Sequence, residues 1–264
     1  MRGAGVGRGR DAWAAAARGP SGHPPGAIAA AAKLSLPLQE ASMATGLKAP
    51  SERARVRRMH ERGAYDRPTI DAVLDAQPLA HVAWTLNGQP RVTPTLQWRE
   101  GDRVYWHGSA ASPMLEHCAD AQVCIAVTLM DGFVLARSAY NHSVNYRSVV
   151  LFGRARSVTD PAEKLARLRA MMEQLFPGRW GTLRAMTAQE IRATSMLSLP
   201  IDEASAKVRS GPPGDDADDL ALPIWAGVVP LRIETLPPVA DPRSPPGLEV
   251  PAHACSVRVG GMPG

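Results

Sequence analysis

The sequence predicts a mainly β protein, built as an antiparallel barrel with a few helices at its periphery. Short runs rich in β-branched and aromatic residues recur at regular spacing, and turn signals that contain glycine separate them. Few segments show the 3.6-residue apolar period of a helix. This combination is typical of all-β sandwiches and barrels.

The first elements follow from local signals. Residues 65–77 predict a helix, with Asp66 as N-cap and Pro68 in the first turn. Asn87-Gly88 predicts a two-residue hairpin between strands 79–86 and 90–98, because both residues accept positive φ. After the turn at residues 100–102, a strand over 103–107 and a short helix over 112–119 are expected.

The middle of the chain predicts two more strands, 122–129 and 133–138, paired across a turn at Asp131-Gly132. A long strand over 146–158 follows. Asp160 and Pro161 then predict a helix that runs to about Phe176.

Towards the C-terminus, Thr187 and Glu190 form the sequence pattern of a capping box, which predicts a shorter helix near Ile191. Strand character returns at three places, and the chain is rich in proline from Pro230 onwards. The three predicted strands are residues 196–199, 204–209 and 220–229.

We expect one folded domain with an extension at each end: residues 1–52, 53–250 and 251–264. Residues 1–42 are rich in Ala, Gly, Pro and Arg and have no periodic apolar face, which predicts disorder. A transit peptide is the more specific alternative, because the segment contains several arginines and few acidic residues. Its longest apolar stretch is however interrupted by Lys33 and Pro37.

The distribution of charge argues against a nucleic-acid partner. The net charge is +5, but residues 1–63 carry 11 Lys+Arg against 4 Asp+Glu, so residues 64–264 carry 19 against 21. A nucleic-acid domain would be expected to carry its positive charge on the fold itself. No apolar run approaches the ~20 residues that a membrane-spanning helix needs, so no membrane partner is expected.

The three cysteines predict a reducing compartment, which we take to be the cytoplasm. Cys118, Cys124 and Cys255 are odd in number and show no CxxC spacing. This pattern indicates neither a disulfide framework nor a zinc site, and no metal is expected.

The stretch from Asp131 to Gly153 is unusually dense in side chains that bind anions. Guanidinium groups, hydroxyls, an imidazole and a phenol follow one another there, an inventory that suits a phosphate and a flat polar ring. The residues are Arg137, Ser138, Asn141, His142, Ser143, Asn145, Tyr146, Arg147 and Ser148.

Two other places are candidates for a site. Pro94 cannot donate a ladder hydrogen bond, so its strand is an edge or is broken where something approaches the backbone. Small residues and hydroxyls follow His107 as far as Ser112 and enter a helix start, where free N–H groups attract anions. An ordinary edge proline and a plain turn are the simpler interpretations. Metalloprotease, α/β-hydrolase and P-loop motifs do not occur, which disfavours hydrolase and NTPase functions.

Together these motifs resemble the pyridoxamine-5′-phosphate-oxidase-like flavin-nucleotide-binding proteins related to nitroimidazole reductases. The resemblance extends from about Arg55 to Val250 and rests on six segments: VTPTL, YWHGSAAS, VTLMDGFVLARSAYNHSVNYRSVVLFGRA, DPAEKLA, EASAKVRSGPP and LPIWAGVVPL. It implies a six-stranded antiparallel split β-barrel of Greek-key type. It also implies a homodimer that binds two FMN molecules at the subunit interface.

The resemblance assigns roles to particular residues. The strand residues Val92, Thr93, Pro94 and Thr95 would offer backbone groups to the flavin ring. His107 would lie beside the flavin as the candidate catalytic residue. The other expected cofactor-binding residues are Gly108, Ser109, Ser112, His142, Asn145, Tyr146, Arg147, Ser148, Lys207 and Trp225.

The sequence departs from the family pattern at one position that is expected to bind the phosphate. Relatives commonly carry Lys or Arg after the position of Ser112, where this chain has Pro113. The phosphate would then depend more on Arg147, on serine hydroxyls and on helix N–H groups. The arginine-rich C-terminal signature of true pyridoxamine-phosphate oxidases is also missing, which argues against vitamin B6 oxidation.

We therefore expect an FMN-dependent oxidoreductase that passes electrons to a small electron-poor acceptor. FMN would supply the redox chemistry, and the protein would set its orientation and surroundings. A deazaflavin-dependent reductase of the same fold is one alternative. A non-catalytic protein that binds or senses flavin is another.

Overall fold

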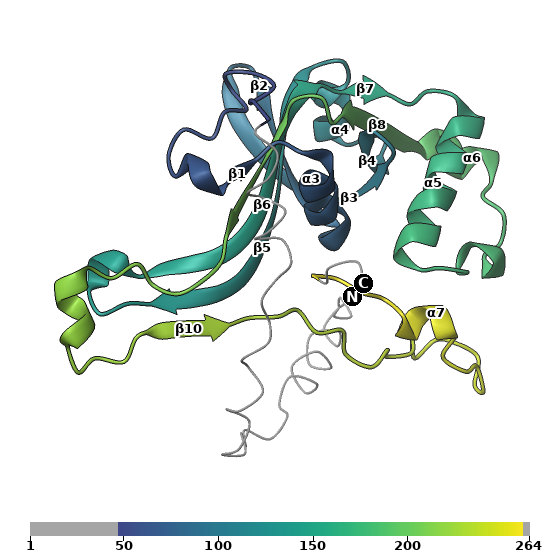
Figure 1. Ribbon diagram of the computed structural model, residues 1–264. Coiled ribbons are helices and arrows are strands. Elements are labelled where there is room, and N and C mark those ends of the chain that lie inside the picture. Colours follow the sequence, from purple (N-terminus) through teal and green to yellow (C-terminus); the bar gives the residue numbers. More distant parts are fainter. Residues whose placement is uncertain (1–46, 261–264) are drawn as a thin grey trace, which may run out of the picture. The chain divides into compact units, whose positions relative to one another are not determined.

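The computed structural model describes residues 47–260, so the segment 1–42 predicted to be disordered lies outside the described residues. Within these residues, ten strands form one sheet in the order β1-β9-β6-β5-β2-β3-β4-β8-β7, with β10 added beside β5 (Figure 1). Every strand pair is antiparallel, which confirms the mainly β class, although more strands are present than the six expected. The strands are β1 Gly63–Ala64, β2 Leu79–Leu86, β3 Gln89–Glu100, β4 Arg103–Ser109, β5 Gln122–Leu135, β6 Ser143–Arg154, β7 Arg156–Ser157, β8 Thr194–Pro200, β9 Ala204–Arg209 and β10 Gly227–Pro230.

The helices of the described residues are short and lie around the sheet. Three capped helices were predicted from sequence, and each cap is present: Asp66, Asp160 and Thr187 accept hydrogen bonds from first-turn backbone N–H groups. The helices are η3 His60–Arg62, α3 Arg67–Ala76, α4 Pro113–Cys118, η4 Ala139–Asn141, α5 Pro161–Leu175, η5 Trp180–Thr182, α6 Ala188–Ala193, η6 Ala217–Ala221 and α7 Ala252–Cys255. None of these is long and apolar enough to cross a membrane.

The hairpin predicted at Asn87-Gly88 is confirmed. The two residues have φ of 51° and 76°, and Leu86 pairs with Gln89 across the turn. The backbone twist of such a turn matches that of the strands it joins.

The hairpin predicted at Asp131-Gly132 is wrong. β5 continues through this dipeptide and pairs with β6 on both sides of it, with a bulge between Met130 and Gly132. A bulge places one extra residue in one strand without reversing the chain. Because β6 is long enough to pair with all of β5, the chain gains more ladder hydrogen bonds by continuing than by turning.

Two further strand predictions are corrected. The strand expected over 146–158 divides at Ala155, because β6 pairs with β5 and β9 whereas β7 pairs with β8. Of the strand expected over 220–229, only its last residues enter β10, and η6 occupies its start. Aspartates and Pro223 around that start disfavour a strand.

Two apolar clusters hold the sheet to its helices. The larger lies between α3 and the sheet and includes Ile70, Val73 and Leu74, which are almost fully buried. The smaller joins α5 to β3, β4 and β8 through Trp98 and Met196, among others. Burying side chains of this size contributes about 1.5–3 kcal/mol each, so these clusters favour the attachment of the helices to the sheet.

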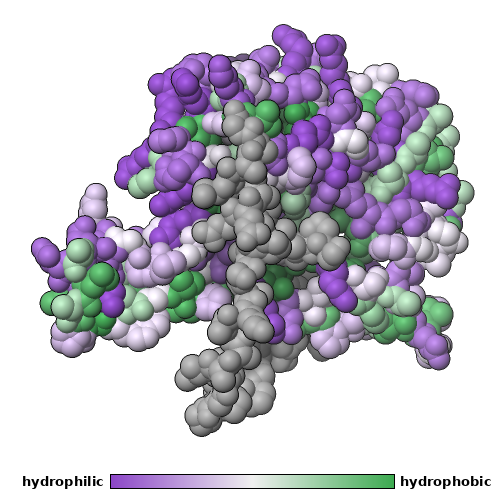
Figure 2. All heavy atoms as spheres, viewed as in Figure 1, coloured by the Kyte–Doolittle hydropathy of each residue, from purple (hydrophilic) through white to green (hydrophobic). Residues whose placement is uncertain are grey.

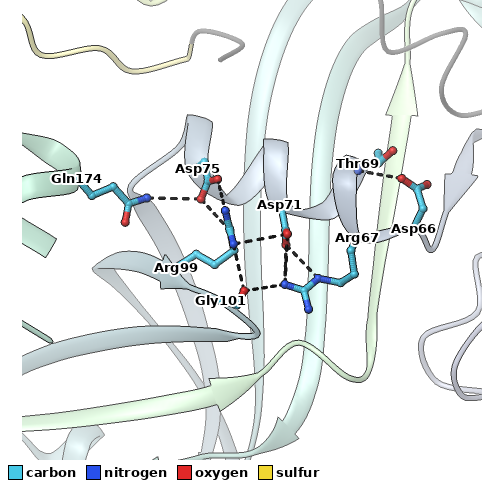
Figure 3. Close-up of polar contacts among 8 residues, drawn as sticks. All are labelled: Asp66, Arg67, Thr69, Asp71, Asp75, Arg99, Gly101 and Gln174. Carbon is cyan, nitrogen blue, oxygen red and sulfur yellow. Dashed lines mark hydrogen bonds and ion pairs between the residues drawn. The ribbon is translucent and has the colours of Figure 1, made fainter. Parts of the chain in front are cut away.

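A polar network ties α3 to the β3–β4 turn (Figure 3). Arg99 donates to Asp75 at 3.0 and 2.6 Å, and Arg67 forms a bidentate contact with Asp71. Both guanidinium groups also donate to the carbonyl of Gly101 in the turn, at 3.1 and 2.8 Å. The network therefore fixes the end of β3 against the helix and sets the direction in which the rest of β3 leaves it.

Candidate functional site

The structure places the predicted site residues in two groups on different parts of the sheet. The first group lies on β3, β4 and the start of α4: Val92, Thr93, Pro94, Thr95, His107, Gly108, Ser109 and Ser112. The second lies on β6 and β9 and beside η4: His142, Asn145, Tyr146, Arg147, Ser148 and Lys207. β5 and β2 separate β6 from β3 in the sheet. One chain therefore does not bring the two groups together in the sheet.

The first group surrounds a free strand edge. β3 and β4 pair only from Gln97 and Trp106 towards their turn, and β4 beyond that point pairs with β8. Within the described residues, the stretch of β3 before Gln97 thus pairs on one side only, with β2. Pro94 lies in this stretch, which confirms that its strand segment is an edge.

Some side chains along this edge are exposed, and another forms a hydrogen bond with the neighbouring strand β2. Val92 is 63% exposed, whereas the Thr93 hydroxyl accepts a 3.1 Å hydrogen bond from Trp84 Nε1. His117 of α4 stacks on Trp84 with 5.9 Å between ring centroids. The edge thus offers unpaired backbone groups, and the contacts of Trp84 with Thr93 and His117 fix the side chains next to it.

His107 lies on β4 just beyond the point where the two strands separate. Its ring meets Trp98 edge to face, with 5.7 Å between centroids. Its Nδ1 is buried and has no hydrogen-bond partner among residues 47–260. Burial lowers the pKa of this imidazole, which favours the neutral form. A neutral imidazole with one unsatisfied nitrogen is suited to a hydrogen bond with a ligand.

The start of α4 is built by close packing. A Cβ on Gly108 would lie 3.1 Å from Leu115 Cδ1, so the absence of a side chain lets β4 approach the helix. The Ser109 hydroxyl accepts from Ala111 N at 3.2 Å, and Ser112 occupies the N-cap position without a side-chain cap hydrogen bond within the described chain.

Arg147, in the second group, is engaged in a buried ion pair. Its side chain is 5% exposed, and its Nε and Nη2 donate to the two carboxylate oxygens of Asp131 at 2.9 and 2.7 Å. Nη2 also donates to the carbonyl of Gly260 at 3.1 Å. The guanidinium therefore closes the β5 bulge, and a phosphate would have to share it with Asp131.

A cleft of about 730 Å³ opens between η3, η4, the start of β6 and the end of β9. Four cationic side chains line it, against one carboxylate, Glu61. The cations are Arg58, Arg62, Lys207 and Arg209. Sequence reasoning identified Lys207 here, together with Tyr146 and His142, but not the three arginines. The basic run before residue 63 and the Arg-Ser-Gly-Pro-Pro segment that begins at the last residue of β9 are the signals that point to them.

Trp225 belongs to neither group. It precedes β10, is 67% exposed, and its ring lies against Gly227, where a Cβ would be 3.0 Å from Cζ2. A second cavity, of about 560 Å³, lies beside α6, but its Arg184 is already paired with Glu190. No group of His, Cys, Asp or Glu within residues 47–260 is arranged to hold a metal ion directly.

Comparison with known proteins identifies related chains. The profile of a family described as pyridoxamine 5′-phosphate oxidase matches residues 66–208, more than half of the chain. The flavocytochrome Anf3 from Azotobacter vinelandii is 50% identical, with a TM-score of 0.79 over 81% of this chain and 100% of that one. The FAD and haem binding protein from Mycobacterium smegmatis is 37% identical, with a TM-score of 0.72 over 75% and 98%. A search of curated proteins finds no significant match.

Proposed function

The chain belongs to the flavin-binding pyridoxamine 5′-phosphate oxidase family, and from this premise we propose that it is a redox protein that holds a flavin and a haem. The observation that carries the proposal is the 50% identity to a flavocytochrome over that protein's whole length. The flavin would exchange electrons with a donor and a small electron-poor acceptor, and the haem would accept or donate single electrons.

For the flavin, the relatives favour FAD over the FMN expected from sequence, since one of them is described as binding FAD and haem. The free edge of β3 would offer N–H and C=O groups of residues 92–95 to the polar edge of the ring. His107, half-buried on β4, would lie beside that edge. In this role it binds and orients, and it stays neutral at neutral pH because burial lowers its pKa.

For the haem, two exposed histidines of the described chain would be the side chains available to hold the iron. His81 is exposed on β2 and lies opposite Pro94, and His117 is exposed on α4 against Trp84. An imidazole is a usual ligand of haem iron.

We further propose that the active form is a homodimer. A second copy would bring the first group of one chain beside the second group of the other, which a single chain keeps apart. The region near β10 also exposes apolar side chains, including Phe133 at 48% and Ile224 at 47%. Figure 2 shows apolar residues gathered over the η6–β10 segment. Three free cysteines support the cytoplasmic location expected from sequence.

The absorption spectrum of the purified protein tests the cofactors. We expect flavin bands and a haem Soret band, with FAD released by acid and haem identified as its pyridine complex. After anaerobic photoreduction of the flavin, the haem should become reduced in turn. A deazaflavin would give a different spectrum, and a protein without turnover would keep its reduced flavin when acceptors are added.

Two results would contradict the proposal in different parts. Colourless protein that takes up neither FAD nor FMN would rule out the flavin. Protein that binds flavin but gives no Soret band after incubation with haemin would rule out the haem.

A further inference from the structure

The cleft between η3, η4, β6 and β9 has the features of a built site. Its floor carries Tyr146 and Arg209, which are directly opposite each other in the antiparallel register of β6 and β9. Arg58 and Arg62 line it from η3 and the residues just before it, and Tyr140 lines it from η4. A volume of about 730 Å³ is within the range of small-molecule sites.

Arg209 is a buried cation without a counterion among the residues that the structure describes. It is 9% exposed, and its hydrogen-bond partners in the described chain are neutral: Nη1 donates to the side-chain oxygen of Asn145, and Nη2 to the carbonyl of Pro212 at 3.4 Å. No carboxylate of residues 47–260 forms an ion pair with it. Burial, followed by repulsion from Arg62, lowers the pKa of this guanidinium. A buried charge in this situation is costly unless an anion compensates it.

The neighbouring cations are also weakly compensated. Arg62 meets only the Glu61 carboxylate within the described chain, and that contact is 3.7 Å long. Lys207 donates to the backbone carbonyl of Arg58 at 3.0 Å, a neutral partner. The contrast is Arg137 nearby, whose guanidinium donates to Asp215 at 2.7 Å. The cations that line the cleft are therefore poorly compensated, whereas the neighbouring Arg137 outside it is paired with a carboxylate.

We infer that this cleft binds the diphosphate group of a nucleotide. Several guanidinium groups around one cleft match a polyanion better than a single carboxylate, because each can make charge-assisted hydrogen bonds to phosphate oxygens. Tyr140, 91% exposed, and Tyr146 offer flat rings on which a base can lie. The diphosphate has two possible sources: FAD itself, which rests on the proposed function, or a separate nucleotide such as a reduced nicotinamide dinucleotide.

The test compares three arginine variants of the full-length protein. Arg62→Gln removes a charge at the rim, Arg209→Gln removes the buried one, and Arg169→Gln, exposed on α5, is the matched control. Thermal unfolding confirms that each variant folds, and Arg62→Gln carries the test if Arg209→Gln does not. The protein as purified is titrated with ADP by calorimetry. Loss of FAD and of FMN on dilution is followed by fluorescence.

Each source predicts its own result. If a separate nucleotide binds, the wild type takes up ADP and Arg62→Gln binds it roughly 10- to 100-fold more weakly. If the FAD diphosphate occupies the cleft, the wild type does not bind ADP, and Arg62→Gln loses FAD but not FMN faster than the Arg169→Gln control.

The inference is overturned if Arg62→Gln and Arg169→Gln behave alike in both measurements. This failure is separate from that of the proposed function. A colourless protein whose ADP binding depends on Arg62 would support the nucleotide site in the cleft and contradict the proposed flavin. A yellow protein in which neither Arg62 nor Arg209 affects binding would support the flavin and contradict the site in the cleft.

Discussion

His107 combines burial with an unsatisfied nitrogen, and this governs its response to pH. Because burial lowers its pKa in the folded protein from the ordinary value of 6.5, the unfolded chain binds more protons between the two values. Stability that depends on His107 is therefore present above about pH 6.5 and is lost as the pH falls below it.

An NMR titration checks this expectation. The His107 ring signal, assigned by its absence in His107→Gln, should titrate with a midpoint below 6.5. The variant should also lose less stability than the wild type between pH 7 and pH 5. A midpoint at or above 6.5 would show that another group compensates the burial.

The ion pair between Arg147 and Asp131 gives Arg147 a structural role. Replacing it in Arg147→Met leaves the partly buried Asp131 carboxylate without its bidentate partner, so we expect a loss of about 2–3 kcal/mol in urea unfolding. Asp131→Asn added to this variant should recover part of the loss, because the unpaired charge is then gone. Arg154→Met, exposed on the same strand, is the control.

The hypothesis that Arg147 also holds the flavin phosphate predicts a second effect. Flavin affinity would then fall about tenfold or more in Arg147→Met, and Asp131→Asn would not restore it. Unchanged flavin affinity in a folded variant would leave the residue with a structural task only.

At the scale of elements, the β5 bulge depends on Gly132. A Cβ there would lie 2.8 Å from the backbone oxygen of Val229 on β10, a contact that only a shift of one strand relieves. We expect Gly132→Ala to destabilise the fold by about 1–3 kcal/mol and to speed hydrogen exchange of the β10 amides. Gly181→Ala, where nothing lies within 4 Å, is the control. Equal unfolding midpoints and equal exchange would mean that β10 is loosely attached.

The separation of β3 from β4 leaves part of β3 with a free edge. A free strand edge is prone to pair with other chains, and Pro94 limits this because it lacks an N–H. The same edge keeps its remaining backbone groups available to a ligand. One proline thus protects the strand from aggregation without closing the site.

At the scale of the whole molecule, the proposed dimer predicts a defined oligomeric state. Sedimentation should show a dimer at micromolar concentration. Trp225→Ser should weaken it by about tenfold or more, because exposed aromatic residues are common hot spots of interfaces. Val239→Ser, which also removes an exposed apolar side chain, is the control and should change little, because Val239 is 91% exposed on the C-terminal segment. A wild-type monomer that retains its flavin would contradict the shared site.

Local signals were sufficient for much of the fold. The mainly β class, the caps at Asp66 and Asp160 and the Asn87-Gly88 hairpin all follow from the sequence, because each depends on side chains and φ angles within a few residues. The family resemblance also followed from motifs that remain contiguous in the chain. Pro94 marked an edge for the same reason, since the missing N–H belongs to the residue itself.

Only the tertiary structure decided how the site residues are grouped. The continuation of β5 through Asp131 depends on pairing with β6, and the bond from Arg147 to Asp131 spans 16 positions. Arg209 meets Asn145 across 64 positions, and the cleft joins it to arginines near residue 60. Charge compensation is a property of neighbours in space. A sequence therefore names the cations, but only the fold decides which of them have a carboxylate partner and which are left to hold a phosphate.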